Sequence, residues 1–195
     1  MSSQLSRRLA LFLPLALATC GEPERVYTPL SYTDLPPIQL NVSDIAVQQQ
    51  FFPAGVAPDV TAQDPEPPAR ALKTMAQDRL QAYGTSNHAV FAITNASLVR
   101  NGDIIDGAMT VTLTIQDNDG ARLGFAEARV TNRRTGRIDS LRGALYDMTK
   151  AMMDDMNIEF EYQIRQHLKP FLTDSIAPAA PVEQAPLDPN LPPRS

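Results

Sequence analysis

The sequence predicts an α+β fold: an antiparallel sheet of about four strands with two helices packed on one face, in the order β-α-β-β-β-α. Three observations lead to this prediction. The prolines gather near both ends of the chain, and none lies between Ala69 and Lys169. Several runs place apolar residues at every second position, as half-buried strands do. Two other segments place them at every third or fourth position, as amphipathic helices do. One domain over residues 36–172 has the usual size of a single hydrophobic core.

The first predicted element is a strand over residues 38–47. Its apolar residues alternate with polar ones up to Val42, and the pattern changes parity at Ile45. The parity change predicts a bulge or bend near Asp44. A long loop follows, up to Pro67.

The second predicted element is a helix that opens at Pro68, because proline is favoured in a first helical turn. A single apolar stripe runs along it to Tyr83, and Gly84 stands where a C-terminal cap is expected. A helix with one apolar side is expected to pack through that side only.

Three further runs predict strands. The run over residues 88–100 has apolar residues at both parities, which predicts burial on both faces. The run over 109–116 alternates apolar residues with polar ones, mostly threonines, so we expect one covered face and one wet face. The sequence DNDG at 117–120 predicts a hairpin turn. The return strand over 123–132 changes parity near Gly124, which predicts a bulge there.

The last predicted element is a long helix that starts at Asp139 or Ser140 and ends near Lys169. About thirty residues at ~1.5 Å each reach about 45 Å, whereas a typical strand spans ~20 Å. We therefore expect this helix to overhang the sheet or to kink, with Asn157 as the place for a kink.

The N-terminus has a different character. Two arginines precede eleven uncharged residues, Leu9 to Thr19, and small residues lead up to Cys20. This order is typical of a secretory signal, and the apolar run has about half of the ~20 residues that a spanning helix needs. We therefore predict a signal over residues 1–19 and a proline-containing tether over 20–35. A proline-rich, disordered tail is predicted over 173–195.

The motif Leu17-Ala18-Thr19-Cys20 resembles the lipobox of bacterial lipoproteins. In that family the cysteine sulfur takes a diacylglycerol, and cleavage leaves the cysteine as the new N-terminus. Thr19 departs from the pattern, since Gly, Ala or Ser is usual there. Two other interpretations remain open: cleavage after Ala18 without lipid, and a retained segment with a buried Cys20. The chain has no other cysteine, so an internal disulfide is excluded.

The predicted element order behind such a cysteine is similar to several families of small Gram-negative envelope lipoproteins. These include the lipoprotein inside the lipopolysaccharide-assembly barrel and the auxiliary lipoproteins of lipid-transport systems. The resemblance implies a non-enzymatic accessory or scaffold protein, anchored by palmitate and other acyl chains on Cys20 and bound to a protein partner. A module that binds lipid or acyl chains is the alternative, and a hydrolase is the least favoured.

In such families, aspartate directly after the cysteine commonly retains the protein in the inner membrane. Gly21 stands at that position here, so the resemblance implies the outer membrane, with the domain facing the periplasm. A soluble periplasmic protein and an inner-membrane anchor remain the alternatives.

The charge of the chain argues against nucleic acid as a partner. The formal net charge is −5, and removal of the predicted signal with its two arginines lowers it to −7. A protein that binds phosphate backbones needs a basic face. Membrane attachment is therefore expected to come from acyl chains, each buried methylene contributing ~0.8 kcal/mol.

The residues that catalysis or metal binding would need are scarce. His88 and His167 are the only histidines, no serine elbow motif lies near either, and neither has a carboxylate at a metal-ligand spacing. The glycines of residues 101–107 predict a hairpin connection, because no Lys-Ser or Lys-Thr follows them. Residues 154–161 carry four carboxylates around one helix, which predicts a solvated face. No enzyme activity, metal site or cofactor is predicted.

Three residues besides Cys20 are candidate contacts with a partner or a lipid. Arg133 and Arg134 belong to the basic segment 129–137, which suits an anionic headgroup, an acidic partner, or simply a turn kept soluble by charge. Met153 lies off the apolar stripe of the last helix, so we consider it a possible contact. The other methionines of that helix lie on the stripe, where core packing is favoured: Met148, Met152 and Met156.

Overall fold

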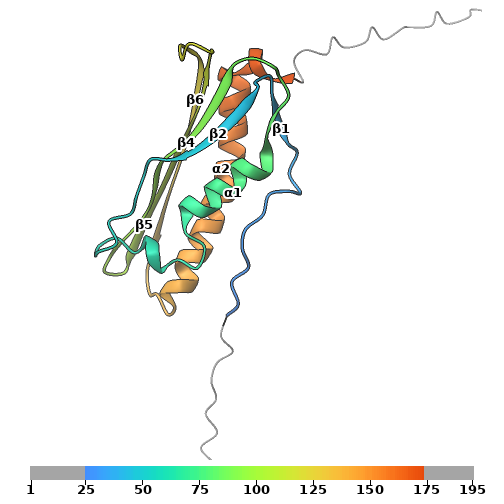
Figure 1. Ribbon diagram of the computed structural model, residues 1–195. Coiled ribbons are helices and arrows are strands. Elements are labelled where there is room, and N and C mark those ends of the chain that lie inside the picture. Colours follow the sequence, from blue (N-terminus) through green and yellow to red (C-terminus); the bar gives the residue numbers. More distant parts are fainter. Residues whose placement is uncertain (1–24, 174–195) are drawn as a thin grey trace, which may run out of the picture.

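The computed structural model describes residues 25–173 and arranges them in two layers (Figure 1). One layer is a four-stranded sheet in the order β2-β4-β5-β6, and helices α1 and α2 cover one of its faces. The bounds are Asp44–Gln49 for β2, His88–Asn101 for β4, Ile104–Gln116 for β5, Arg122–Thr135 for β6, Pro68–Arg79 for α1 and Leu141–His167 for α2. The predicted α+β class is confirmed. The predicted signal and residues 174–195 lie outside the described residues.

A second, smaller sheet pairs two short strands in parallel, β1 (Ile38–Leu40) and β3 (Leu80–Ala82). The single strand predicted over residues 38–47 is therefore wrong. The chain bends between β1 and β2, and the two pieces join different sheets. The parity change in the sequence marks this bend. Two single 3-10 turns, Thr61–Gln63 and Lys169–Phe171, complete the elements.

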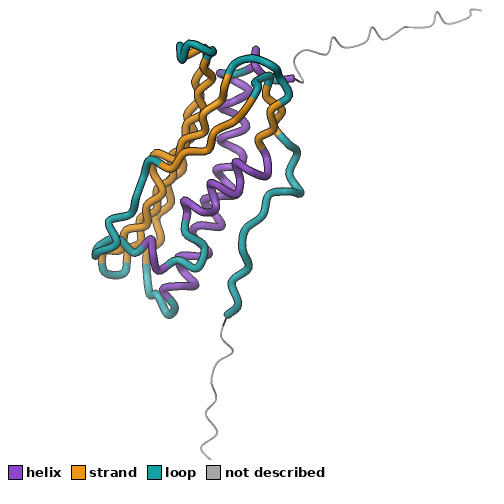
Figure 2. The backbone as a smooth tube through the Cα atoms, viewed as in Figure 1, coloured by secondary structure: helices purple, strands orange, loops and turns teal. Residues whose placement is uncertain are grey.

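The four-stranded sheet is antiparallel between β4, β5 and β6, but β2 runs parallel to β4. Asp44 lies opposite His88, and Gln49 lies opposite Ile93. Between β2 and β4 the chain passes through α1, which lies on the helical layer and is drawn in purple in Figure 2. A connection that crosses over a sheet in this way joins parallel neighbours. The alternation of apolar residues does not reveal this direction.

Helix α1 ends at Arg79, four residues before the predicted end at Tyr83. The next residues are extended because they pair with β1, and the N–H groups of Tyr83 and Gly84 donate to the carbonyls of Leu40 and Val42 at 2.9 Å. Gly84 is therefore not a helix cap. A Cβ atom at this position would lie 2.6 Å from the backbone next to Val42, so glycine is needed for the close approach of two chain segments.

Replacing Gly84 with alanine is expected to destabilise the domain by about 2–3 kcal/mol, because rigid backbone cannot move away from the added methyl group. The matched control is Gly107→Ala. Its Cβ would meet the flexible ends of Met148 and Met152 at 2.8–2.9 Å, so we expect a loss of about 1 kcal/mol or less. Urea denaturation measures both changes. A loss in the control equal to or larger than that of Gly84→Ala would contradict this account.

The apolar residues at both parities in β4 result from a β-bulge. The register shifts between Ile93 and Asn95, so Phe91 and Ile93 before the shift face the helices, as does Leu98 after it. These three side chains are at most 1% exposed. On the face of β4 that points away from the helices, only Ala92 is buried, at 4% exposed. The predicted burial on both faces is therefore limited to this residue.

The alternation in β5 is confirmed: its core-facing residues, Met109, Val111, Leu113 and Ile115, are all 0% exposed. On the opposite face Thr112 and Thr114 are partly exposed, whereas Thr110 is buried. The DNDG segment forms the predicted turn, with Gly120 at a φ of +83°. The predicted bulge in β6 is also present, since Ile115 pairs with Gly124 while the next residue pairs with Arg122.

The difference in length from which the sequence predicts an overhang of α2 or a kink at Asn157 is not present in the structure. Its 27 residues reach about 40 Å, and the 13 to 14 residues of β4, β5 and β6 reach a similar length at ~3.3 Å each. The strands are longer than predicted because β5 begins at Ile104. Gly107 thus lies inside β5 and outside the hairpin connection, which is the two-residue turn after Asn101. Ser140 caps α2, as expected, by accepting a hydrogen bond from the N–H of Gly143.

The hydrophobic core fills the space between the sheet and the helices. Phe91 of β4 meets Phe160 of α2 edge to face, with 5.4 Å between the ring centroids. The predicted packing of Met148, Met152 and Met156 against the core is confirmed, since each is at most 4% exposed. Every member of this buried cluster lies between Tyr32 and Leu172.

Candidate functional site

The first described residues form an extended segment along the helical layer, residues 25–36, which we call the N-terminal strap (Figure 1). Arg25 donates two hydrogen bonds to Asp147 of α2, at 3.0 and 2.5 Å, and these lower the pKa of the Asp147 carboxyl. The ring of Tyr27 lies 5.2 Å from that of Tyr146. The Tyr146 hydroxyl donates to a strap carbonyl at 2.7 Å. The strap is therefore fixed at the start of α2.

Tyr32 fixes the strap a second time. Its N–H donates to Asp78 of α1 at 2.8 Å, and its side chain is 6% exposed. Burial, and next the negative charge of Asp154, raise the pKa of the Tyr32 phenol well above its usual value. The phenol therefore stays neutral, although its hydroxyl has no hydrogen-bond partner among residues 25–173. A solvated tether is predicted over residues 20–35, whereas residues 25–35 contact both helices.

A cavity of about 350 Å³ opens between the strap and α2. Its apolar lining comes from Leu30, Leu35, Met153 and Ile158. Met153 is fully buried at this cavity, which explains why it lies off the stripe that faces the sheet. The candidate contact Met153 thus faces the strap and the cavity.

The two candidate arginines lie in β6, which continues to Thr135, and not in the turn that the sequence predicts. Arg133 pairs with Asp106 of β5, with 2.6 Å between Nε and Oδ1. Arg134 is exposed and makes no ion pair with any described residue. The structure therefore places these neighbours in different surroundings.

Strand β6 is an edge of the sheet, and no described strand pairs with its outer side. Two hollows run between β6 and α2. One, of about 380 Å³, lies between Thr131 and Ile158, and the other, of about 280 Å³, lies between Arg134 and Met148. Ile158 is 73% exposed at the first hollow. The edge of β6 therefore has backbone groups that pair with no described strand, and beside them two hollows that could receive the side chains of a bound peptide.

His88 lies in a polar cluster that the sequence did not reveal. The imidazole Nδ1 contacts the Asp44 carboxylate, and the Ser43 hydroxyl lies 3.4 Å from the same nitrogen. A catalytic triad needs the acid on one ring nitrogen and the nucleophile on the other. Both groups here meet Nδ1, so this arrangement cannot relay a proton from serine to aspartate. His167 is exposed at the end of α2.

The carboxylates of residues 154–161 form only in part the predicted solvated face. Asp154 and Asp155 are exposed, but Glu161 accepts a hydrogen bond at 2.7 Å from Arg79, which is 2% exposed. Arg79 also donates to the backbone and side-chain oxygens of Asn157 at 3.3 and 3.2 Å. Its remaining hydrogen bonds go to the Pro36 carbonyl. One buried guanidinium thus joins α1, α2 and the strap.

A second buried polar group lies at the other end of the helix pair. Asp64 is 4% exposed and accepts hydrogen bonds from the Thr149 hydroxyl at 2.6 Å and from the Glu66 N–H at 2.9 Å. Burial raises the pKa of the Asp64 carboxyl to about 6. Burial also raises the pKa of Glu66, opposed by Arg70.

Stability is expected to fall as the pH rises from about 4 to about 6, because of Asp64. The folded chain holds this proton more tightly than the unfolded chain, whose carboxyl titrates near 3.8. The contribution of Asp64 is therefore full below pH 3.8 and lost above the folded pKa. Asp64→Asn should flatten this part of the profile, measured as urea midpoints at pH 4 and pH 7. The exposed control Asp103→Asn should keep the wild-type slope, and an unchanged slope in Asp64→Asn would contradict the prediction.

Within residues 25–173, no three His, Cys, Asp or Glu side chains are grouped so that they could hold a metal ion. In the same range, no helix is both long enough and apolar enough to cross a bilayer.

No protein-family model matches the chain, and no curated protein matches it. Solved structures that resemble it include a minor lipoprotein from Acinetobacter baumannii, at 14% identity and a TM-score of 0.35, which covers 66% of this chain and 96% of its own. A protein from Caulobacter crescentus, also named as a lipoprotein, has 15% identity and a TM-score of 0.34. It covers 64% of this chain and 88% of its own. At these values neither structure assigns a family, a ligand or a partner.

Proposed function

We propose that this protein is a lipid-anchored, non-enzymatic accessory protein of the Gram-negative envelope. Acyl chains on Cys20 hold it to the outer membrane, and the domain faces the periplasm. There it offers the free edge of β6 to an extended segment of a larger envelope assembly, in biogenesis or in lipid transport.

The lipid anchor is supported by the position of Cys20. It follows the apolar run directly, and it precedes the first strap contact, Arg25, by only five residues. Gly21, where aspartate would favour the inner membrane, supports the outer membrane.

The observation that carries the accessory role is the unpaired edge of β6, 14 residues long. An extended peptide can pair with such an edge through backbone hydrogen bonds, and its alternate side chains then fill neighbouring pockets. The two hollows between β6 and α2 provide this space.

Photo-crosslinking in growing cells tests the accessory role. A photoreactive amino acid replaces Glu127, Arg129 or Thr131, three exposed positions on one face of β6. We expect the same protein adduct from all three positions, mapped to one extended segment. The matched control is exposed Lys73 on α1, which should give no such adduct. Equal adducts from Lys73, or none from β6, would contradict the role of this edge.

The cavity beneath the strap supports a second candidate, binding of an acyl chain. Its lining by Leu30, Leu35 and Met153 suits an apolar ligand, and the unpartnered Tyr32 hydroxyl suits a polar headgroup atom. Purification from crosslinked membranes separates the candidates. A stoichiometric protein supports the accessory role, whereas extracted lipid without protein supports the binding module.

A further inference from the structure

We propose that one end of the domain lies against the headgroups of an anionic bilayer, so that the long strands stand upright on the membrane. The inference rests on the lipid attachment of Cys20 proposed above and adds the orientation of the domain. The membrane-facing end contains the β4–β5 turn and the start of α2, and we call it the basic end. Its arginines are Arg100, Arg133, Arg134, Arg137 and Arg142.

The N-terminal strap starts at this same end. Arg25 is held by Asp147, near the start of α2, and its guanidinium lies 5.4 Å from the ring centroid of Tyr27. Figure 1 shows the first described residues beside the beginning of α2. A chain extends at most ~3.6 Å per residue, so the five residues from Cys20 to Arg25 span at most about 18 Å. A lipid on Cys20 would therefore keep the basic end near the bilayer.

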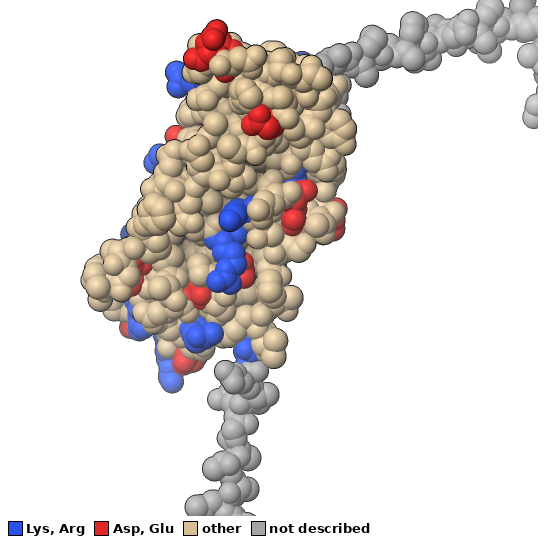
Figure 3. Space-filling view, viewed as in Figure 1, with Lys and Arg blue, Asp and Glu red and all other residues tan. Residues whose placement is uncertain are grey.

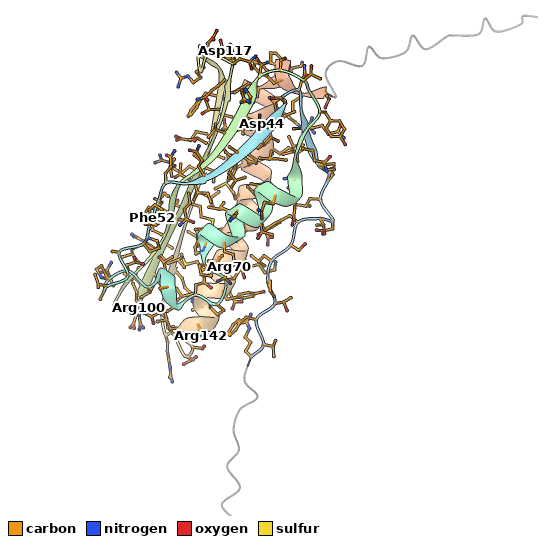
Figure 4. All side chains as sticks on the ribbon, viewed as in Figure 1. Asp44, Phe52, Arg70, Arg100, Asp117 and Arg142 are labelled. Carbon is orange, nitrogen blue, oxygen red and sulfur yellow. The ribbon has the colours of Figure 1, made fainter. Side chains whose placement is uncertain are left out.

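With Arg25 included, arginine exceeds carboxylate at the basic end by six to five. The carboxylates there are Asp59, Asp103, Asp106, Asp139 and Asp147. Three of them are already paired, Asp106 with Arg133, Asp139 with Arg137 and Asp147 with Arg25. The other arginines, Arg100, Arg134 and Arg142, make no ion pair within the described part of the chain. At this lower end Figure 3 shows basic side chains with acidic ones among them, and Figure 4 labels Arg100 and Arg142 there.

The opposite end of the domain has a different balance of charge. It holds three carboxylates, Asp44, Asp117 and Asp119, against two basic side chains, Arg122 and Lys169. Figure 4 labels Asp117 at the far end from Arg142. The 13 residues of β5 separate the two turns by about 43 Å at ~3.3 Å each. An anionic surface therefore attracts the basic end and repels the acidic turn.

The energies suit an anchored protein. A basic side chain near an anionic leaflet contributes ~1 kcal/mol, and arginine binds phosphate through two parallel hydrogen bonds. Three free arginines would hold a soluble domain only weakly. A lipid anchor raises their effective concentration at the surface, so that the same contacts can orient the domain.

The test uses the lipidated chain in vesicles of phosphatidylcholine and phosphatidylglycerol that carry a nitroxide quencher on the headgroup. A fluorophore is attached to a cysteine placed at Asn101, in the basic end, or at Asn118, in the far turn. Both residues are exposed and neutral. We expect quenching several-fold stronger at Asn101 than at Asn118. Equal quenching at the two positions, with the protein still on the vesicles, would overturn the orientation.

A charge-reversed variant tests the arginines themselves. Arg134→Glu with Arg142→Glu should remove most of the difference between the two labels. The control Arg122→Glu with Lys169→Glu changes the net charge by the same amount at the far end, and it should keep the difference. An unchanged difference in the first variant would overturn the headgroup contact. Protein that does not float with the vesicles at all would instead overturn the lipid attachment.

Discussion

Replacing Arg79 with methionine is expected to cost the domain about 3 kcal/mol, a large part of the 5–15 kcal/mol that typically separates folded from unfolded domains. The side chain is 2% exposed and hydrogen-bonds Asn157, Pro36 and Glu161. Methionine retains much of the apolar volume, so the loss comes from polar groups. An unmade buried hydrogen bond costs about 1–3 kcal/mol, and Asn157, whose two oxygens both accept from Arg79, is only 7% exposed.

The matched control for this prediction is Arg165→Met. Arg165 binds the same Glu161 carboxylate at 2.9 Å, but its side chain is 57% exposed. Exposed ion pairs contribute ~0–1 kcal/mol, so the control should change the free energy of unfolding by less than about 0.5 kcal/mol. Urea denaturation compares the two variants. Equal losses, or a loss below about 1 kcal/mol in Arg79→Met, would show that the buried guanidinium is not what joins the two helices and the strap.

Replacing Cys20 with serine is expected to move the protein from the membrane fraction to the soluble fraction or to leave it as an uncut precursor. Serine offers no thiol for the diacylglycerol, so the acyl chains are lost. Each methylene contributes ~0.8 kcal/mol, so two or three chains hold a protein almost permanently. Cell fractionation and gel mobility measure the change.

The neighbouring substitution Thr19→Gly provides the control for Cys20→Ser. It restores a residue that the lipobox usually has before the cysteine, so the protein should remain in the membrane fraction with at least as much mature form. If wild type and Cys20→Ser both appeared as mature, soluble protein, cleavage after Ala18 without lipid would be the better interpretation. The domain itself should fold in either case, because neither substitution changes a member of the buried cluster within residues 25–173.

Much of the sheet could be predicted from local pattern. In β5, each core-facing residue from Met109 to Ile115 is fully buried, because one side of the sheet is covered and the other is not. The hairpin turn at Gly120 could be predicted in the same way, since a turn position with positive φ favours glycine. These features depend only on neighbours in sequence.

Features that depend on distant partners could not be predicted. The parallel direction of β2 follows from the path of the chain over the sheet. The length of β4 and β5 follows from the tight turn near Gly102, which lets the two strands pair almost to their ends. Arg79 lies seven residues after Leu72 and is buried on the same side of α1, although a charged side chain is expected on the polar side of a helix. Its burial requires Glu161 and Asn157, more than seventy residues away. Only the spacing from Leu72 could have indicated it.

The candidate site was predicted in part. The position of Met153 off the apolar stripe marks it as unusual, whereas its partner, the N-terminal strap, is predicted only as part of a solvated tether. The apolar Leu30, Leu35 and Tyr32 in that segment were the available signal. The sequence indicates Arg134 through charge alone, and the structure adds that it lines the same hollow as Asp147, the residue that binds Arg25.

The mass of the N-terminal peptide of the exported protein, after growth with a palmitate analogue, tests the central claim most directly. The account predicts a peptide that begins at Cys20, carries diacylglycerol on its sulfur and contains the analogue. A peptide with a free Cys20 thiol and no analogue, from protein that washes off the envelope in mild buffer, would contradict it.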